Sequence, residues 1–220
     1  MTTPDPEFIR NRTTEVVLGD GTRVVLRPLV PGDGRKILEA FARMSPESRY
    51  RRFMSPVDEL SPEMLRKLTD VDYVDHFAWA ALAADEPGQP GIGVARYVRT
   101  EDHPEVAEAA VTVIDEYQGR GLGTLLLQVL GAAALEHGIT RFRGFVLEGN
   151  RAMREILEES GARTTHDGAG LVRVEVDLPI DDDVRSSPAY RALRALARGE
   201  GPKLLQWGAL WERPAEPLDS

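Results

Sequence analysis

A glycine-rich turn that opens a long apolar helix constrains the fold of this chain more than any other sequence feature. The turn reads Gln118-Gly119-Arg120-Gly121-Leu122-Gly123-Thr124, follows an apolar strand and carries glycine at alternate positions. Glycine reaches backbone conformations closed to other residues and lets a ligand approach the main chain. Because the first amides of a helix have no intrahelical partner and the helix dipole adds positive charge, the turn is suited to bind phosphate. The Arg120 side chain would add a charge-assisted contact.

Two kinds of nucleotide site use a glycine turn of this type, and the spacing disfavours both. A Walker A loop requires Gly-Lys-Ser/Thr, and no lysine lies within residues 118–124. A Rossmann site is closer, because Glu148 ends the next strand, where a ribose-binding acid would lie. However, glycines at 119, 121 and 123 miss the G-x-G-x-x-G spacing, and Thr124 takes the place of the third glycine. A Rossmann site and a turn of purely structural role remain the weaker alternatives.

Apolar runs separated by turn signals predict a mixed sheet with helices on both faces. Strands are expected at residues 16–18, 22–27, 77–84, 91–98, 108–114, 142–147 and 171–178. Helices are expected within residues 33–68 and at 122–136 and 150–159. The strands first meander and then alternate with helices, which is typical of a sheet covered on both faces.

The chain of 220 residues fits one catalytic domain with extensions. We expect an N-terminal tail at residues 1–15 and the catalytic domain at residues 16–179. A C-terminal extension at residues 180–220 would contain one helix, at 188–198, and an apolar tail.

Arginines and tryptophans distinguish the C-terminal extension. Arg191, Arg194 and Arg198 share one face of its helix, which predicts an exposed charged face. Trp207 and Trp211 make the tail too apolar to stay free. We therefore expect it to dock on this domain or, in a homodimer, on a second copy of the chain.

The charge balance and the residue types present limit the partners of this protein. With 27 basic and 36 acidic residues the net charge is -9, which disfavours binding to nucleic acid or to an anionic membrane. The absence of cysteine excludes thiolate metal sites and a cysteine-bound acyl intermediate, and the four histidines lack ligand spacing, so we expect no metal. The N-terminus lacks the features of a secretory signal and no apolar run is long enough to span a membrane, so we expect a cytoplasmic location.

The glycine turn resembles the acetyl-CoA-binding motif of the GNAT N-acetyltransferase superfamily. Gln118-x-x-Gly121-x-Gly123 matches the Q/R-x-x-G-x-G/A motif, in which backbone amides hold the pyrophosphate of acetyl-CoA. The strand at 107–113 and the sequence Asn150-Arg151-Ala152-Met153 match the flanking pieces, and the likeness covers roughly residues 20–178. It implies an α/β fold of the α+β type, with a mixed, mostly antiparallel sheet of six to seven strands flanked by helices on both faces.

The resemblance also implies which residues contact the acyl donor. The acetyl-CoA contacts it implies are Val111, Val113, Gln118, Gly119, Arg120, Gly121, Leu122, Gly123, Thr124, Asn150 and Met153. A main-chain amide near Val111 to Val113 would stabilise the thioester oxygen during the reaction. Within the family, the sequences Arg49-Tyr50-Arg51-Arg52-Phe53 and Leu68-Thr69-Asp70-Val71-Asp72-Tyr73 look most like bacterial protein lysine acetyltransferases.

Glu108 is the candidate general base in this resemblance. An amine acceptor is mostly protonated at neutral pH, so attack on a thioester needs a group that removes the proton. Many relatives also place a tyrosine seven residues after the asparagine to protonate the departing thiolate, whereas this chain has Leu157 there. A glutamate-driven enzyme is therefore expected, acting on a protein lysine or a small amine. The alternative is a non-catalytic acyl-CoA-binding sensor, which would keep the turn without needing Glu108.

Overall fold

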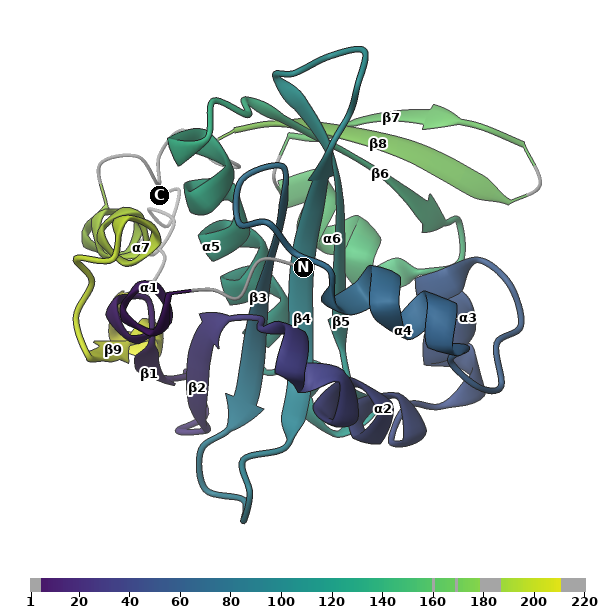
Figure 1. Cartoon of the computed structure of the whole chain (residues 1–220). Coiled ribbons are helices and arrows are strands. Elements are labelled where there is room, and N and C mark those ends of the chain that lie inside the picture. The colour runs from purple at the N-terminus through teal and green to yellow at the C-terminus, as the bar shows by residue number, and fades with distance from the viewer. Residues whose placement is uncertain (1–4, 160, 169, 179–186, 211–220) are drawn as a thin grey trace, which may run out of the picture.

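A mixed sheet of nine strands organises the protein, whose computed structural model describes residues 5–159, 161–168, 170–178 and 187–210 (Figure 1). The strand order is β7-β8-β6-β5-β4-β3-β2-β1-β9. The strands are β1 (Thr14–Val17), β2 (Arg23–Pro28), β3 (His76–Ala83), β4 (Gly91–Arg99), β5 (Val106–Val113), β6 (Arg141–Leu147), β7 (Arg163–His166), β8 (Leu171–Asp177) and β9 (Leu204–Gln206). Neighbours are antiparallel except β5–β6 and β1–β9, which confirms the predicted mixed, mostly antiparallel sheet.

The sheet has more strands than the six to seven expected. Strand β7 has four residues, all exposed, so it lacks the apolar alternation by which a strand is recognised in sequence. Strand β9 has only three residues and pairs with β1, which lies far from it in the chain. Both strands form because a neighbouring strand offers an open edge, and this cannot be seen locally in the sequence.

Helices cover both faces of the sheet, as predicted. They are α1 (Pro6–Asn11), α2 (Gly34–Ala42), α3 (Pro46–Phe53), α4 (Pro62–Thr69), α5 (Leu122–Glu136), α6 (Arg151–Glu159), α7 (Pro188–Arg198) and α8 (Trp207–Leu210), with short 3₁₀ turns η1 (Pro31–Asp33) and η2 (Asp115–Tyr117). Figure 1 shows α2, α3 and α4 in front of the sheet and α5 and α6 behind it. Helix α5 is apolar around most of its circumference because it lies between the sheet and α7.

The C-terminal extension docks on the body of this chain. Strand β9 extends the sheet beside β1, and Trp207 is only 3% exposed. Helix α7 packs against α5, where Arg194 and Arg198 both pair with Glu136, so this part of its charged face is engaged. Trp211 lies outside the described residues. The homodimer through this extension stays a prediction.

The segment expected as an N-terminal tail contains ordered structure. Asp5 caps α1 by accepting a hydrogen bond from the Glu7 amide, and Pro6 occupies the first turn. Phe8 packs on Tyr73, with ring centroids 5.0 Å apart, and Arg12 Nε donates to Ala197 O at 2.9 Å. The N-terminal segment therefore packs against both the domain and the extension, through contacts between residues distant in sequence.

Strands β5 and β6 pair over a short length and then diverge (Figure 1). Their parallel ladder runs from Val106↔Arg141 to Glu108↔Arg143. Beyond this point β5 continues to Val113 on its pairing with β4, while β6 continues to Leu147 on its pairing with β8. The far edge of β5 after Glu108 is therefore free of strand pairing.

Candidate active site

The unpaired edge of β5 presents main-chain groups from alternate residues. Ile114 N donates to Ile92 O and Thr100 N donates to Val106 O, both at 3.0 Å, so even-numbered residues of β5 form the hydrogen-bonded pairs with β4. Because bonding alternates along an antiparallel strand, the amides of Val111 and Val113 point to the opposite edge. That edge lies past the last pair with β6. The structure thus provides two amide donors where the sequence led us to expect stabilisation of a thioester oxygen.

The glycine turn leaves the first amides of α5 and the space above them accessible. Gly119 and Gly121 have φ of 73° and 80°, in the left-handed region that favours glycine. The helical ladder begins with Leu125 N donating to Gly121 O at 3.0 Å, so the amides of residues 122–124 precede it. A Cβ atom built at Gly119, Gly121 or Gly123 would meet no atom within 4 Å, so there is open space over the turn. These amides and the helix dipole make a site for an anion.

The Arg120 side chain extends to the β1–β2 turn. Its guanidinium donates to Thr22 Oγ1 at 3.1 Å and Asp20 Oδ2 at 3.3 Å, and also to Glu116 O at 3.0 Å. The charge of Arg120 is thus engaged by a carboxylate distant in sequence, and its contact with phosphate stays a prediction.

Gln118 joins the glycine turn to the helical layer in front of the sheet. Its Nε2 donates to Val113 O at 3.0 Å and to Ser48 Oγ at 3.3 Å. Ser48 Oγ in turn donates to Asp115 Oδ1 at 2.8 Å, and Asp115 also accepts from the Ser45 amide at 2.9 Å. Burial tends to raise the pKa of Asp115, but the hydrogen bonds from Ser45 and Ser48 outweigh it and lower that pKa overall.

The sequence marks Ser45 only as the start of a helix and indicates no role for Ser48 or Asp115 at the site. Ser45 and Ser48 are about seventy positions from their partners in η2 and the turn, and serine at a helix start is usually explained by capping alone. Ser45 does cap α3, since its side chain accepts from the Ser48 amide. No local pattern would have revealed the second role.

Tyr117 is held by a charged cluster beside the turn. Its hydroxyl donates to Glu86 Oε1 at 2.6 Å, and Arg43 pairs with Glu86 at 3.4 Å and with Glu116 at 2.7 Å. Burial, and then Glu86, raise the pKa of Tyr117 to about 12. The Tyr117 hydroxyl therefore serves a structural contact within this cluster.

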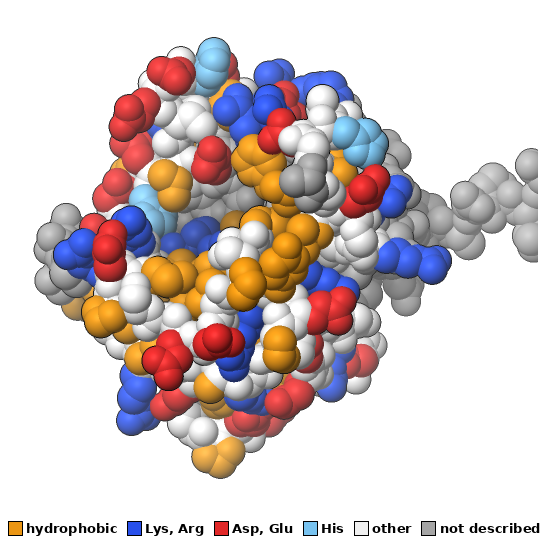
Figure 2. All heavy atoms as spheres, turned by 90° about the vertical axis from the view of Figure 1, so that its right-hand side faces the viewer, with side chains coloured by type: hydrophobic (Ala, Val, Ile, Leu, Met, Phe, Trp, Pro, Cys, Tyr) orange, Lys and Arg blue, Asp and Glu red, His pale blue; other side chains and the backbone are white. Residues whose placement is uncertain are grey.

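Glu108 lies where β5 and β6 separate. Its position is paired with Val98 in β4 and with Arg143 in β6, and its side chain is exposed. Because side chains alternate along a strand, Glu108 shares its face with Thr112, while Val111 and Val113 point to the α5 side. Figure 2 shows the right-hand side of the molecule in Figure 1, where a hollow is bordered by hydrophobic side chains on one side and by basic and histidine side chains on the other.

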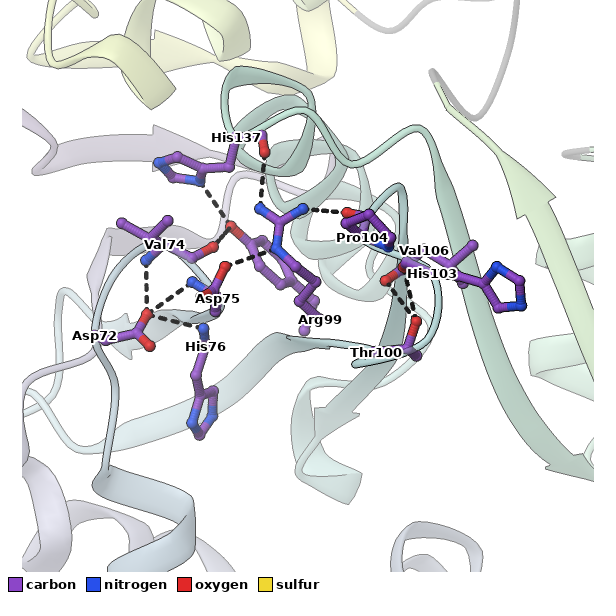
Figure 3. Close-up of polar contacts among 11 residues, drawn as sticks. Asp72, Val74, Asp75, His76, Arg99, Thr100, His103, Pro104, Val106 and His137 are labelled. Atoms are coloured by element: carbon purple, nitrogen blue, oxygen red, sulfur yellow. Dashed lines mark hydrogen bonds and ion pairs between the residues drawn. The ribbon is translucent and has the colours of Figure 1, made fainter.

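A polar network fixes the strand ends next to Glu108 (Figure 3). Arg99 Nε donates to Asp75 Oδ1 at 2.6 Å and its Nη2 donates to His137 O at 2.8 Å. Thr100 Oγ1 donates to His103 O at 2.8 Å in the turn between β4 and β5. Arg99 directly follows Val98, the residue of β4 that pairs with Glu108. These bonds therefore fix the end of the β4–β5 pair that carries Glu108.

Asn150 begins α6, the helix beside the diverging strands. Its Oδ1 accepts from the Met153 amide at 3.3 Å, as at a helix N-cap. Met153 and Leu157 pack on a small core cluster formed by Val146, Val172, Val174 and Val176. Position 157, where relatives carry a tyrosine, thus contributes to packing in this chain.

Two further features of the described residues bear on the predicted partners. Among them, no group of three or more His, Asp or Glu side chains is arranged to hold a metal ion. None of the described helices has the length and apolar character needed to cross a membrane. The cytoplasmic location stays a prediction.

Comparison with known sequences identifies relatives over most of the chain. A family model described as an acetyltransferase (GNAT) domain matches residues 23–163. Acetyltransferase Pat of Mycolicibacterium smegmatis is 40% identical over 163 residues, an alignment that covers 74% of this chain and 48% of the relative. This chain therefore spans about half the length of that protein. Acetyltransferase PA5475 of Pseudomonas aeruginosa is 34% identical over 139 residues, covering 63% of this chain and 74% of the relative.

Solved structures give the same assignment. The GNAT domain of S. lividans PAT superposes with a TM-score of 0.69 at 32% identity, covering 76% of this chain and 97% of that domain. A cAMP-binding acyltransferase from Mycobacterium smegmatis superposes with a TM-score of 0.59 at 35% identity, covering 86% of this chain and 54% of that protein. The turn, the diverging strands and these relatives agree: the chain belongs to the GNAT acetyltransferase family.

Proposed function

We propose that the chain transfers the acetyl group of acetyl-CoA directly to a primary amine, either a protein lysine or a small molecule, with Glu108 as general base. One observation carries the proposal. A single strand, β5, bears Glu108 at the point where its edge becomes unpaired and leads along that edge to the open amides of the glycine turn.

The acyl donor would bind along this edge. Its pyrophosphate would accept hydrogen bonds from the amides of residues 119–124, where the space over the turn is open. The pantetheine arm would pass between β5 and the start of α6, near Asn150 and Met153. Its thioester oxygen would then accept from the amide of Val111 or Val113, which stabilises the negative charge that develops there during attack.

Glu108 would remove the proton from the incoming ammonium. Lysine has a reference pKa of about 10.4, so little free amine is present at neutral pH. Glu108 is three residues from Val111, which is about 10 Å along a strand. This separation favours proton transfer through a water molecule, as in other general-base reactions.

The departing thiolate would leave without a dedicated tyrosine. Leu157 packs in the core, and the hydroxyl of Tyr117 is bonded to Glu86. Because the reference pKa of a thiol is about 8.5, the thiolate is a tolerable leaving group near neutral pH.

The acceptor would approach the open face around Glu108. Val98 and Phe145 are large apolar side chains that are 45% and 41% exposed. These side chains share the face of Glu108 and would contact the apolar stem of a lysine or another amine.

A thiol-release assay with acetyl-CoA and a panel of amines, including a lysine-rich protein, tests the proposal. Glu108→Gln is expected to keep acetyl-CoA affinity and lose most of its rate. The matched control is Glu105→Gln, an exposed acid three positions earlier. Binding of acetyl-CoA with no thiol release from any amine would instead support a sensor, and a normal rate in Glu108→Gln would exclude this base.

A further inference from the structure

A pocket lies between helices α2–α4 and the front face of the sheet, and the proposed transfer does not use it. Its wall is mostly apolar, with Leu29, Ile37, Phe41, Met44, Phe53 and Leu60 among its lining residues. It encloses about 680 Å³, including the part open to solvent. On the sheet side it reaches Thr112 of β5. The pocket therefore adjoins the strand segment proposed to hold the thioester.

A buried arginine of β4 forms part of the pocket wall. Arg96 is only 7% exposed, and its Nη2 donates to Leu68 O at 2.6 Å at the end of α4. Its Nη1 lies 3.3 Å from His76 Nε2 and 3.5 Å from Lys67 O. Its Nε is buried and has no hydrogen-bond partner among the described residues. The guanidinium is thus rigidly placed, with one donor left over.

A second arginine, Arg52, lines the same pocket. Arg52 extends from α3, and burial lowers its pKa. Burial, and then the charge of Arg52, lower the pKa of Arg96 to about 9, which leaves both side chains charged at neutral pH. Within the described part of the chain, no Asp or Glu forms an ion pair with either one. Asp33 also lines the pocket, but it is bound by Arg27 through two contacts of 2.6 and 2.8 Å.

A buried hydroxyl adds a further polar group to the pocket wall. Thr112 Oγ1 is buried and lacks a hydrogen-bond partner in the described part of the structure. Buried cations and hydroxyls cost free energy when they stay unpaired, and a bound anion would satisfy them. The apolar wall adds a preference for a ligand with a hydrocarbon portion.

We propose that this pocket binds a carboxylate carried on a short apolar chain. The carboxylate would lie between Arg52 and Arg96, accepting from the free Nε and from Thr112 Oγ1, with the chain against the apolar wall. Because Thr112 lies between Val111 and Val113, this carboxylate would belong to a substrate: either the far end of a dicarboxylic acyl group or the acid group of an amine acceptor. This assignment to a substrate rests on the proposed function, whereas binding of the carboxylate does not.

Calorimetric titration of the whole chain with hexanoate, and with hexanamide as its uncharged analogue, tests the binding. Hexanoate is expected to bind about tenfold or more tightly than hexanamide, since charge-assisted hydrogen bonds exceed neutral ones by that order. Arg52→Gln and Thr112→Val should each weaken the binding of hexanoate. The control is Arg51→Gln, whose guanidinium pairs with Glu47 instead. Equal binding of the two probes, or hexanoate binding unchanged in both variants, would overturn the proposal.

Two comparisons with the Arg52→Gln variant distinguish the source of the carboxylate. A higher Kd for succinyl-CoA with an unchanged Kd for acetyl-CoA assigns it to the donor. A higher KM for 6-aminohexanoate with an unchanged KM for hexylamine assigns it to the acceptor. If neither value changes, the pocket is not a substrate site. Hexanoate binding in a chain that transfers no acetyl group would reject the proposed function and leave the pocket assignment standing.

Discussion

Ser48 of α3 donates to the carboxylate of Asp115 at 2.8 Å and also accepts from the Gln118 side chain at 3.3 Å. One hydroxyl therefore connects the helical layer in front of the sheet to the turn proposed to hold the pyrophosphate. The geometry of the turn depends on this connection as well as on its own glycines.

Ser48→Ala should weaken acetyl-CoA binding more than it slows the chemical step. Loss of the hydroxyl leaves Gln118 with one partner fewer and costs about 1 kcal/mol in stability. We expect a severalfold higher KM for acetyl-CoA and a nearly unchanged kcat in steady-state kinetics. Ser55→Ala is the control, because Ser55 donates to Phe53 O at the end of the same helix region and makes no hydrogen bond with the turn among the described residues. An unchanged KM would show that the turn holds its shape without this link.

Glu108→Gln should reduce kcat by about 10²- to 10⁴-fold at neutral pH, the usual contribution of a general base. The deficit should shrink as pH rises toward the pKa of the amine, because more acceptor is then already deprotonated. Rate measurements across alkaline pH, with Glu105→Gln alongside, check this. A deficit independent of pH would point to a role in binding the acceptor.

A comparison of Gly123→Ala with Gly121→Ala should separate the effect of blocking the ligand's approach from the effect of backbone strain. Gly123 lies in the first turn of α5 with open space at its Cβ position, so alanine should leave stability unchanged or raise it by up to about 1 kcal/mol. The new methyl group would occupy space needed by the pyrophosphate, and we expect a clear loss of acetyl-CoA affinity in titration. Gly121→Ala, at φ of 80°, should also lose stability, by roughly 1–2 kcal/mol.

The docking of α7 on α5 should depend on pH through Glu136. Burial alone would raise the pKa of Glu136, but hydrogen bonds from Arg198 and Arg194 outweigh it and lower that pKa. A lowered pKa means that the stabilisation is present above the unfolded-state value, near 4.3, and is lost as pH falls through the folded-state value. Glu136→Gln should therefore reduce Tm at neutral pH, by an amount that disappears in acid.

Removal of residues 187–220 should destabilise the folded chain. The deletion would remove β9 from the edge of β1 and expose the face of α5 that α7 covers. We expect a lower Tm and a tendency to associate in size-exclusion chromatography. A truncated chain with unchanged Tm and elution volume would show that the extension contributes nothing to the fold.

Local sequence patterns predicted the strand-turn-helix unit at the site. Glycine at 119, 121 and 123 and the apolar run of α5 are adjacent in sequence, so their conformations could be predicted from residue properties alone. The same holds for the serine caps of α3 and α4 and for the helix of the extension. Strand β7 was missed because it has no apolar face, and β9 because its only support is a distant strand.

The sequence by itself determined that a glycine turn opening an apolar helix follows a strand bearing a glutamate, since both depend on neighbouring residues. Only the tertiary structure decided which groups meet across the chain. The order of the sheet and the layer α2–α4 draw Arg120 to Asp20, join Ser48 to Asp115, and place Arg52 and Arg96 at one pocket, where neither pairs with an acidic side chain of the described residues. Such contacts depend on packing between segments tens of residues apart, which residue spacing does not encode.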